Sequence, residues 1–173
     1  MTLGALLERY AQFEKRGVGL YRGLAERFAA DLEAARLWRE MSNTEASHFA
    51  LFELAQDWVA MAGGGSAPPA ATSESLDMLA RRMGEIEDRA ADPGTMLSTA
   101  VSLTVAWEEL ELPRVLELLP YLPAKAQGRV LAGMIGEAPE HYRLLSELAV
   151  AAGGAQDTER IAALASIARG ALG

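Results

Sequence analysis

The two histidines of this chain each lie within a similar stretch of sequence, and this repetition constrains the fold more than any other feature. Met41–Leu51 and Met134–Leu144 both begin with methionine, carry a histidine seven residues later and end on leucine. A glutamate lies 34 residues before His48, and another lies 33 residues before His141. A repeat of this length predicts two successive helical hairpins, which together supply four helices.

Apolar residues recur every three or four positions over most of the sequence, which is the period of an amphipathic helix. Glycines and a proline pair interrupt this pattern after residue 62, and glycine and tandem proline favour a connecting segment. We therefore expect an all-α fold in one domain spanning residues 1–173. Its predicted parts are hairpin 1 at about 3–62, a crossover at 63–94 with a short helix, hairpin 2 at about 95–151, and a C-terminal helix at about 157–171.

Composition excludes several kinds of site. The chain has no cysteine, so disulfides, zinc–thiolate sites, iron–sulfur centres and cysteine nucleophiles are ruled out. A net charge of -8 argues against nucleic-acid and anionic membrane partners. No nucleotide-binding motif is present, so no organic cofactor is predicted. The first residues do not resemble a signal peptide, and no apolar run is long enough to span a bilayer, so we expect a cytoplasmic location.

Three glutamates interrupt apolar helical faces. Glu14, Glu45 and Glu108 each occupy a position in a helical stripe whose other members are mostly apolar. Burying an unpaired polar group costs roughly 2–7 kcal/mol, and a charged one costs more. Each carboxylate therefore needs a compensating partner. For Glu14 that partner is either a metal ion or an arginine such as Arg16 or Arg36.

The Glu45–His48 spacing favours a metal ion. Residues three apart lie on one face of a helix, so a carboxylate and an imidazole can reach the same ion. Carboxylates suit hard cations, while imidazole shifts the preference toward iron, manganese or zinc. Four-helix bundles that hold two ions take single glutamates from two helices and Glu-x-x-His pairs from the other two. A lone histidine on an apolar face is otherwise typical of an ordinary core residue.

These residues resemble the rubrerythrin branch of the ferritin-like di-iron carboxylate proteins. The resemblance covers both hairpins and is carried by Phe13–Tyr21, by Trp38–His48, by Glu108 and by His141. It implies a ferritin-like four-helix bundle of two antiparallel hairpins holding two iron ions, with manganese or zinc as other possibilities. Tyr21 is expected to be a packing residue whose polar tip could hydrogen-bond a ligand carboxylate. The implied metal ligands are Glu14, Glu45, His48, Glu108, Glu137 and His141.

The second hairpin departs from the family pattern. Alignment of the two histidine stretches places Ala138 where Glu45 stands, and Glu137 lies one residue away. Pro139 removes a backbone donor and could wind the helix so that Glu137 turns inward. Val115 replaces an aromatic residue of the family. The remaining acidic residues nearby, Glu109, Glu111 and Glu140, are expected on solvated faces.

The resemblance implies a di-iron oxidoreductase that reduces O2 or H2O2 or oxidises Fe(II). Because no cysteine is present, a peroxidase of this kind needs an external electron donor. A homodimer is expected, with no nucleic-acid or membrane partner. The alternative is a ferritin-like bundle with a degenerate site that holds one metal or none and serves as an interaction or assembly module. Ala138 and Pro139 favour this alternative.

Overall fold

The computed structural model describes residues 1–136 and 138–172, and the regular elements in that part of the chain are helices. One isolated β-bridge joins Thr2 to Ser66. The all-α prediction is therefore confirmed. Of the helices in these two ranges, none combines the length and the apolar character that a membrane crossing requires.

The helices lie close to their predicted positions. In chain order they are α1 (Leu3–Arg27), α2 (Leu32–Met61), α3 (Ser73–Ala91), α4 (Leu97–Leu118), the 3-10 turn η1 (Leu119–Tyr121), α5 (Ala124–Val130), the π-helical turn η2 (Leu131–Ile135), α6 (Ala138–Ala151) and α7 (Ala155–Leu172). The predicted hairpins correspond to α1–α2 and to α4 with α5–α6, and α3 is the short helix of the crossover.

Short polar residues set where helices begin. The Asp31 side chain accepts a hydrogen bond from the Ala34 backbone N–H at 3.0 Å and caps the start of α2, which follows α1 after the four residues 28–31. Thr72 and Ser75 form a reciprocal capping box at the start of α3. The tight 28–31 turn makes α1 and α2 antiparallel neighbours.

The second helix of the predicted hairpin 2 is interrupted. It consists of α5, the π-helical turn η2 and α6, and it contains Pro139 in the first turn of α6. Pro139 has no backbone N–H, so the carbonyl of Ile135, four residues earlier, cannot receive the usual helical hydrogen bond. A wider turn at this point is a common way to accommodate such a break.

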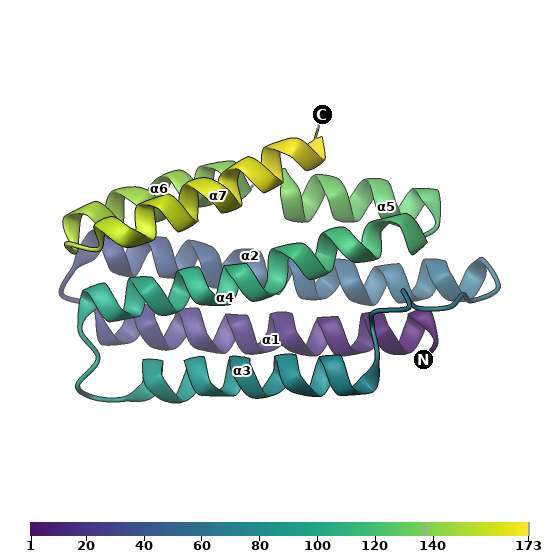
Figure 1. Cartoon of the computed structure of the whole chain (residues 1–173), viewed down its shortest axis with the longest axis horizontal. Coiled ribbons are helices and arrows are strands. Elements are labelled where there is room, and N and C mark those ends of the chain that lie inside the picture. Colours follow the sequence, from purple (N-terminus) through teal and green to yellow (C-terminus); the bar gives the residue numbers. More distant parts are fainter. Residues whose placement is uncertain (137, 173) are drawn as a thin grey trace.

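Figure 1 shows how the helices are arranged. The α1–α2 hairpin packs along its length, and α3 contacts both α1 and α4. On the opposite side, α6 contacts α2 and α4, while α7 covers α4 and α6. Helices α1, α2, α4 and α6 thus enclose a common interior.

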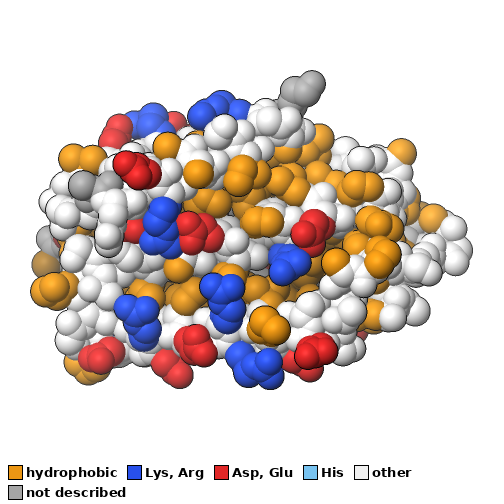
Figure 2. All heavy atoms as spheres, in the orientation of Figure 1, with side chains coloured by type: hydrophobic (Ala, Val, Ile, Leu, Met, Phe, Trp, Pro, Cys, Tyr) orange, Lys and Arg blue, Asp and Glu red, His pale blue; other side chains and the backbone are white. Residues whose placement is uncertain are grey.

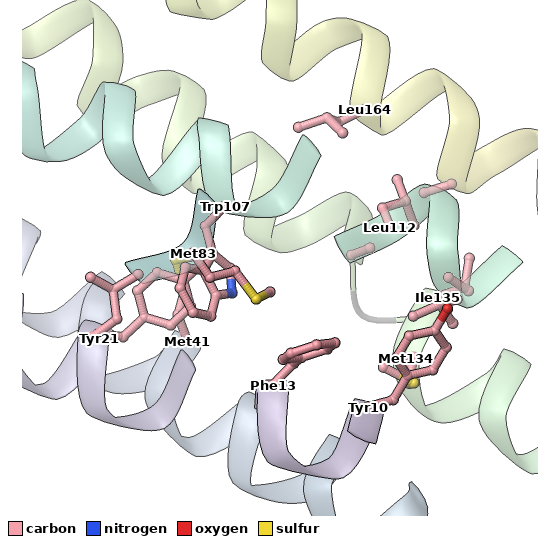
Figure 3. Close-up of a cluster of buried hydrophobic side chains, with 14 of the residues drawn as sticks. Tyr10, Phe13, Tyr21, Met41, Met83, Trp107, Leu112, Met134, Ile135 and Leu164 are labelled. Carbon is pink, nitrogen blue, oxygen red and sulfur yellow. The ribbon is translucent and has the colours of Figure 1, made fainter. Parts of the chain in front are cut away.

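That interior is filled with large apolar side chains. Trp38, Trp107 and Phe52 are fully buried. Figure 3 shows the aromatic and methionine side chains that α1, α2, α3, α4 and η2 contribute to the core. The Trp38 indole N–H donates to Thr104 Oγ1 at 2.9 Å, which satisfies its polar atom. A dense apolar interior of this kind makes any unpaired carboxylate within it expensive.

Arginines fasten α3 to α1 at the surface. Arg16 makes two hydrogen bonds with Glu87, at 2.8 and 2.7 Å, and Arg9 pairs with Asp77. On the face shown in Figure 2, basic and acidic side chains lie close to one another. Surface pairs such as Arg9–Asp77 contribute little to stability individually.

Asp157 ties α7 to α4. Its fully buried carboxylate accepts hydrogen bonds from Ser102 Oγ at 2.5 Å and from Arg160 at 2.7 Å. We predict that Asp157→Ala lowers the free energy of unfolding by about 1–3 kcal/mol, because it removes the hydrogen bond that joins α7 to Ser102 of α4 and the charge-assisted bond to Arg160. Urea unfolding measures the change. Glu159→Ala, at an exposed position of the same helix, is the control, and an equal loss in the two variants would contradict the prediction.

Candidate metal centre

Three helices bring four potential ligands to one point in the interior. Glu14 comes from α1, Glu45 and His48 from α2, and Glu111 from α4. One ligand atom from each residue lies within 4.8 Å of the others. Glu14, Glu45 and His48 are buried, and Glu111 is partly exposed. We call these four residues the ligand cluster.

Several buried polar atoms of the ligand cluster lack hydrogen-bond partners. Among the residues that the structure describes, six buried side-chain nitrogen or oxygen atoms make no hydrogen bond, and five of them belong to this cluster. They are Glu14 Oε2, Glu45 Oε2, Glu111 Oε2 and both ring nitrogens of His48. His48 Nδ1 lies 3.4 Å from Glu14 Oε2 without forming a hydrogen bond. Buried polar atoms almost always have partners, and this concentration of unpaired oxygen and nitrogen atoms forms a group that could hold a cation.

Neither of the arginines considered as partners for Glu14 neutralises it. Arg16 binds Glu87 and the carbonyl of Ala80, and Arg36 pairs with Glu40 at the surface. Glu14 therefore forms no ion pair with Arg16 or Arg36, and a metal ion stays its predicted partner.

Burial and mutual repulsion both raise the pKa values of the buried carboxyls Glu14 and Glu45. Burial raises the pKa of Glu14 well above its usual range, and the charge of Glu111 raises it further. Burial raises the pKa of Glu45 as well, with added repulsion from Glu111 and Glu14. A divalent cation would favour the charged forms of the Glu14, Glu45 and Glu111 carboxyls and would compete with protons for them.

Glu108 lies beside the ligand cluster and has other partners. Tyr21 donates a hydrogen bond to its Oε1 at 2.7 Å, and Tyr142 donates one to its Oε2 at 3.1 Å. Burial raises the pKa of Glu108 to about 7, although the two tyrosine hydroxyls oppose the shift. Tyr21 therefore hydrogen-bonds a carboxylate, and that carboxylate is Glu108.

The expectation that Glu111 lies on a solvated face was wrong. Its Oε2 is buried, and the residue completes the ligand cluster in the place that the sequence suggested for Glu108. The two glutamates are three residues apart, so they share a helix face. The positions 104, 108, 111 and 115 have helical spacing, and this signal could have identified Glu111. The exposed positions predicted for Glu109 and Glu140 are confirmed, because these residues pair with Arg160 and Arg143 at the surface.

His141 stands apart from the ligand cluster. Its Nε2 lies 3.4 Å from Thr44 Oγ1, and its side chain lines a cavity of about 40 Å³. Ala138 lines the same cavity at the position where the family carries a glutamate. The sixth predicted ligand, Glu137, lies outside the described residues.

The cavity adjoins the ligand cluster. Glu45, His48, Glu108 and Glu111 form part of its wall, together with apolar side chains such as Met134. A volume of about 40 Å³ is larger than the roughly 10–15 Å³ needed for one water molecule. The space could therefore admit a metal-bound water or a small oxidant.

Gly17 makes room for Glu45. A Cβ atom at this position on α1 would lie 2.9 Å from Glu45 Oε2 and 3.1 Å from Glu45 Cδ. Atoms at these separations overlap, so a side chain at residue 17 would push the carboxylate aside. The sequence analysis missed this role, because Gly17 occurs in the apolar stripe of α1 without any local turn signal.

The raised pKa values predict how pH affects the metal-free protein. Glutamates with a folded-state pKa above the ordinary value of 4.5 bind more protons when the protein is folded. Their favourable contribution is fully present below that value and declines as pH rises through the folded-state pKa, about 7 for Glu108. We therefore expect the chelated protein to lose stability between about pH 5 and about pH 8 in urea titrations. Glu108→Gln should reduce this slope, and an unchanged slope would contradict the assignment.

The donor set fits a first-row transition metal. Three carboxylates and one imidazole suit iron, manganese or zinc, and the absence of cysteine disfavours softer metals. Comparisons of the chain with protein-family models, curated proteins and solved structures gave no match.

Proposed function

We propose that the chain is a ferritin-like, non-haem iron protein that reduces O2 or H2O2 or oxidises Fe(II). The ligand cluster carries this proposal, since it combines four converging ligand atoms with five unpaired buried polar atoms. Bound iron would supply the electrons for reducing the oxidant, or it would itself be the Fe(II) that is oxidised. Manganese and zinc are the other candidates for this donor set.

Each part of the site has a distinct task in this proposal. Glu14, Glu45, His48 and Glu111 would hold one iron ion. Tyr21 and Tyr142 fix the Glu108 carboxyl at the edge of the cavity, where it can accept or release a proton near neutral pH. The surrounding apolar side chains limit water around the ligands, which strengthens their electrostatic interaction with a cation.

Two candidate forms of the metal site differ in the number of iron ions that they hold. The cavity beside the ligand cluster, lined by Glu108 and His141, favours a second iron. The tyrosine bonds to both oxygens of Glu108, and alanine at residue 138, favour a single iron. Metal analysis should give about two ions per chain for the first form and about one for the second. A chain that binds no metal would instead fit a bundle serving as an interaction or assembly module.

Matched substitutions on α4 test the ligand set. The apoprotein is titrated anaerobically with Fe(II), Mn(II) or Zn(II), and affinity and stoichiometry are measured by calorimetry and elemental analysis. Glu111→Gln should weaken binding more than about 100-fold, because it removes a ligand, whereas the exposed control Glu109→Gln should leave binding unchanged. Equal binding by both variants would overturn the assignment of Glu111.

The proposal also bears on the electron donor, the oligomeric state and the location of the protein. With no cysteine in the chain, electrons for a peroxidase reaction would come from an external donor. A homodimer and a cytoplasmic location stay predictions.

A further inference from the structure

The two repeated stretches of sequence each begin with a methionine, and the proposed function gives these two residues no task. Met41 precedes Glu45 by four residues on α2, and Met134 in η2 precedes Ala138 by four residues. Residues four apart share a helix face, so Met41 lies on the same face as a residue of the ligand cluster. Both methionines line the cavity beside that cluster.

These two methionines are buried, but there is space next to them. Met41 is 2 % exposed and Met134 is 5 % exposed. They are well separated in Figure 3, so they line different parts of the cavity. The cavity is partly open to the surface, and its volume of about 40 Å³ exceeds the roughly 10–15 Å³ that one water molecule needs. A molecule with two oxygen atoms, such as hydrogen peroxide, therefore fits beside either side chain.

Met83 is equally buried but has less space beside it. It is 1 % exposed, and it lines a hollow of about 10 Å³ among α1, α3 and α4. This hollow is no larger than the roughly 10–15 Å³ needed for a single water molecule, so hydrogen peroxide does not fit there. The other four methionines of the chain are exposed, and they are Met1, Met61, Met78 and Met96.

We propose that Met41 and Met134 form a peroxide-oxidation site inside the protein. Hydrogen peroxide in the cavity transfers one oxygen atom to a thioether sulfur. The O–O bond breaks, an S=O bond forms, the sulfur loses two electrons, and the rest of the peroxide leaves as water. The use of peroxide at a metal rests on the proposed function, whereas this step needs only peroxide and the metal-free protein.

Oxidation at this site would change what the cavity can hold. A methionine sulfoxide is polar and carries one more oxygen atom than the thioether. That oxygen would take up space next to Glu45 and Glu108, which line the same cavity. Less room would then be left for water or for a further molecule of oxidant. Methionine sulfoxide reductases reverse the modification, so the two methionines would report how much peroxide has reached the site.

Peptide mapping of the metal-free protein tests the proposed site. The protein is treated with excess hydrogen peroxide, samples are quenched over time and digested, and mass spectrometry gives the sulfoxide fraction at each methionine. Met41 and Met134 should be oxidised more than about tenfold faster than Met83, because Met83 reacts only when the surrounding structure opens. The exposed Met61 and Met96 should react fastest and give the rate of an unprotected thioether.

Two controls distinguish reaction in the cavity from local unfolding. tert-Butyl hydroperoxide transfers oxygen in the same way but is too bulky for the cavity. With this reagent, the rates at Met41 and Met134 relative to Met61 should fall by about tenfold or more. Ala138→Leu extends a side chain into the cavity and should slow both reactions with hydrogen peroxide without changing the rate at Met61. Ala163→Leu, at an exposed position of α7, should change none of these rates.

Three results would overturn the proposal. They are a rate at Met41 or Met134 no faster than at Met83, equal relative rates with the two hydroperoxides, and unchanged rates when the cavity is filled. Circular dichroism confirms folding, and Thr44→Leu fills the same cavity if Ala138→Leu does not fold. The oxidation assay contains no metal, so it can succeed or fail independently of the iron-binding proposal.

Discussion

Replacing Glu45 with glutamine is expected to stabilise the metal-free protein and to weaken metal binding more than about 100-fold. Glutamine keeps the shape of the side chain but removes a carboxylate that is buried, unpaired at Oε2 and repelled by Glu111 and Glu14. The glutamine amide is still a buried polar group, but it carries no charge, and burying a charge costs more than burying an amide, so the apoprotein should gain roughly 1–3 kcal/mol at about pH 8. Urea unfolding and metal calorimetry on the same samples measure the two effects.

The opposite signs of these two effects make the test specific. A carboxylate that helped to hold the bundle together would destabilise the apoprotein when replaced, as Asp157 should. His48→Ala should also weaken metal binding strongly, because it removes the imidazole of the ligand cluster. Glu53→Gln, on the exposed side of α2, serves as the control for both. An apoprotein weakened by Glu45→Gln, with metal binding intact, would refute the proposed centre.

The helices were predictable from sequence because their signals are local. The apolar period locates α1, α2 and α4, and the glycine and proline residues after Met61 mark the crossover. Pro139 indicated a distortion in the second hairpin, but sequence alone could not show that a π-helical turn would absorb it. The choice of turn depends on how the segment packs against α2, which is a tertiary effect.

The ligand cluster was only partly predictable, because the decisive factor is which face of α4 points inward. Glu108 and Glu111 have similar helical spacing to the apolar positions of α4. A rotation of α4 about its axis by less than half a turn therefore decides which of the two glutamates reaches the ligand cluster. Two tyrosines from α1 and α6 hold Glu108 and leave Glu111 to meet α2. Contacts between helices far apart in sequence decided this, and no local pattern contains them.

Gly17→Ala should weaken metal binding about tenfold or more without the stabilisation that alanine normally gives a helix. Alanine in place of glycine within a helix usually adds about 1 kcal/mol. At residue 17, however, the new Cβ would lie 2.9 Å from Glu45 Oε2, and the carboxylate would have to leave its position in the ligand cluster. Gly23→Ala on the same helix has nothing within 4 Å of the added atom, so it should show the full gain and normal metal binding.

A double-mutant cycle tests whether Gly17 and Glu45 are energetically coupled. If Gly17 acts only by leaving space for Glu45, then Gly17→Ala should recover its gain of about 1 kcal/mol in a protein that already carries Glu45→Ala. The coupling should vanish when Gly23 takes the place of Gly17 in the cycle. Additive effects of Gly17→Ala and Glu45→Ala on unfolding would show that the glycine does not position the carboxylate. A measured coupling would instead make the close approach of α1 to Glu45 a built-in requirement for the geometry of the centre.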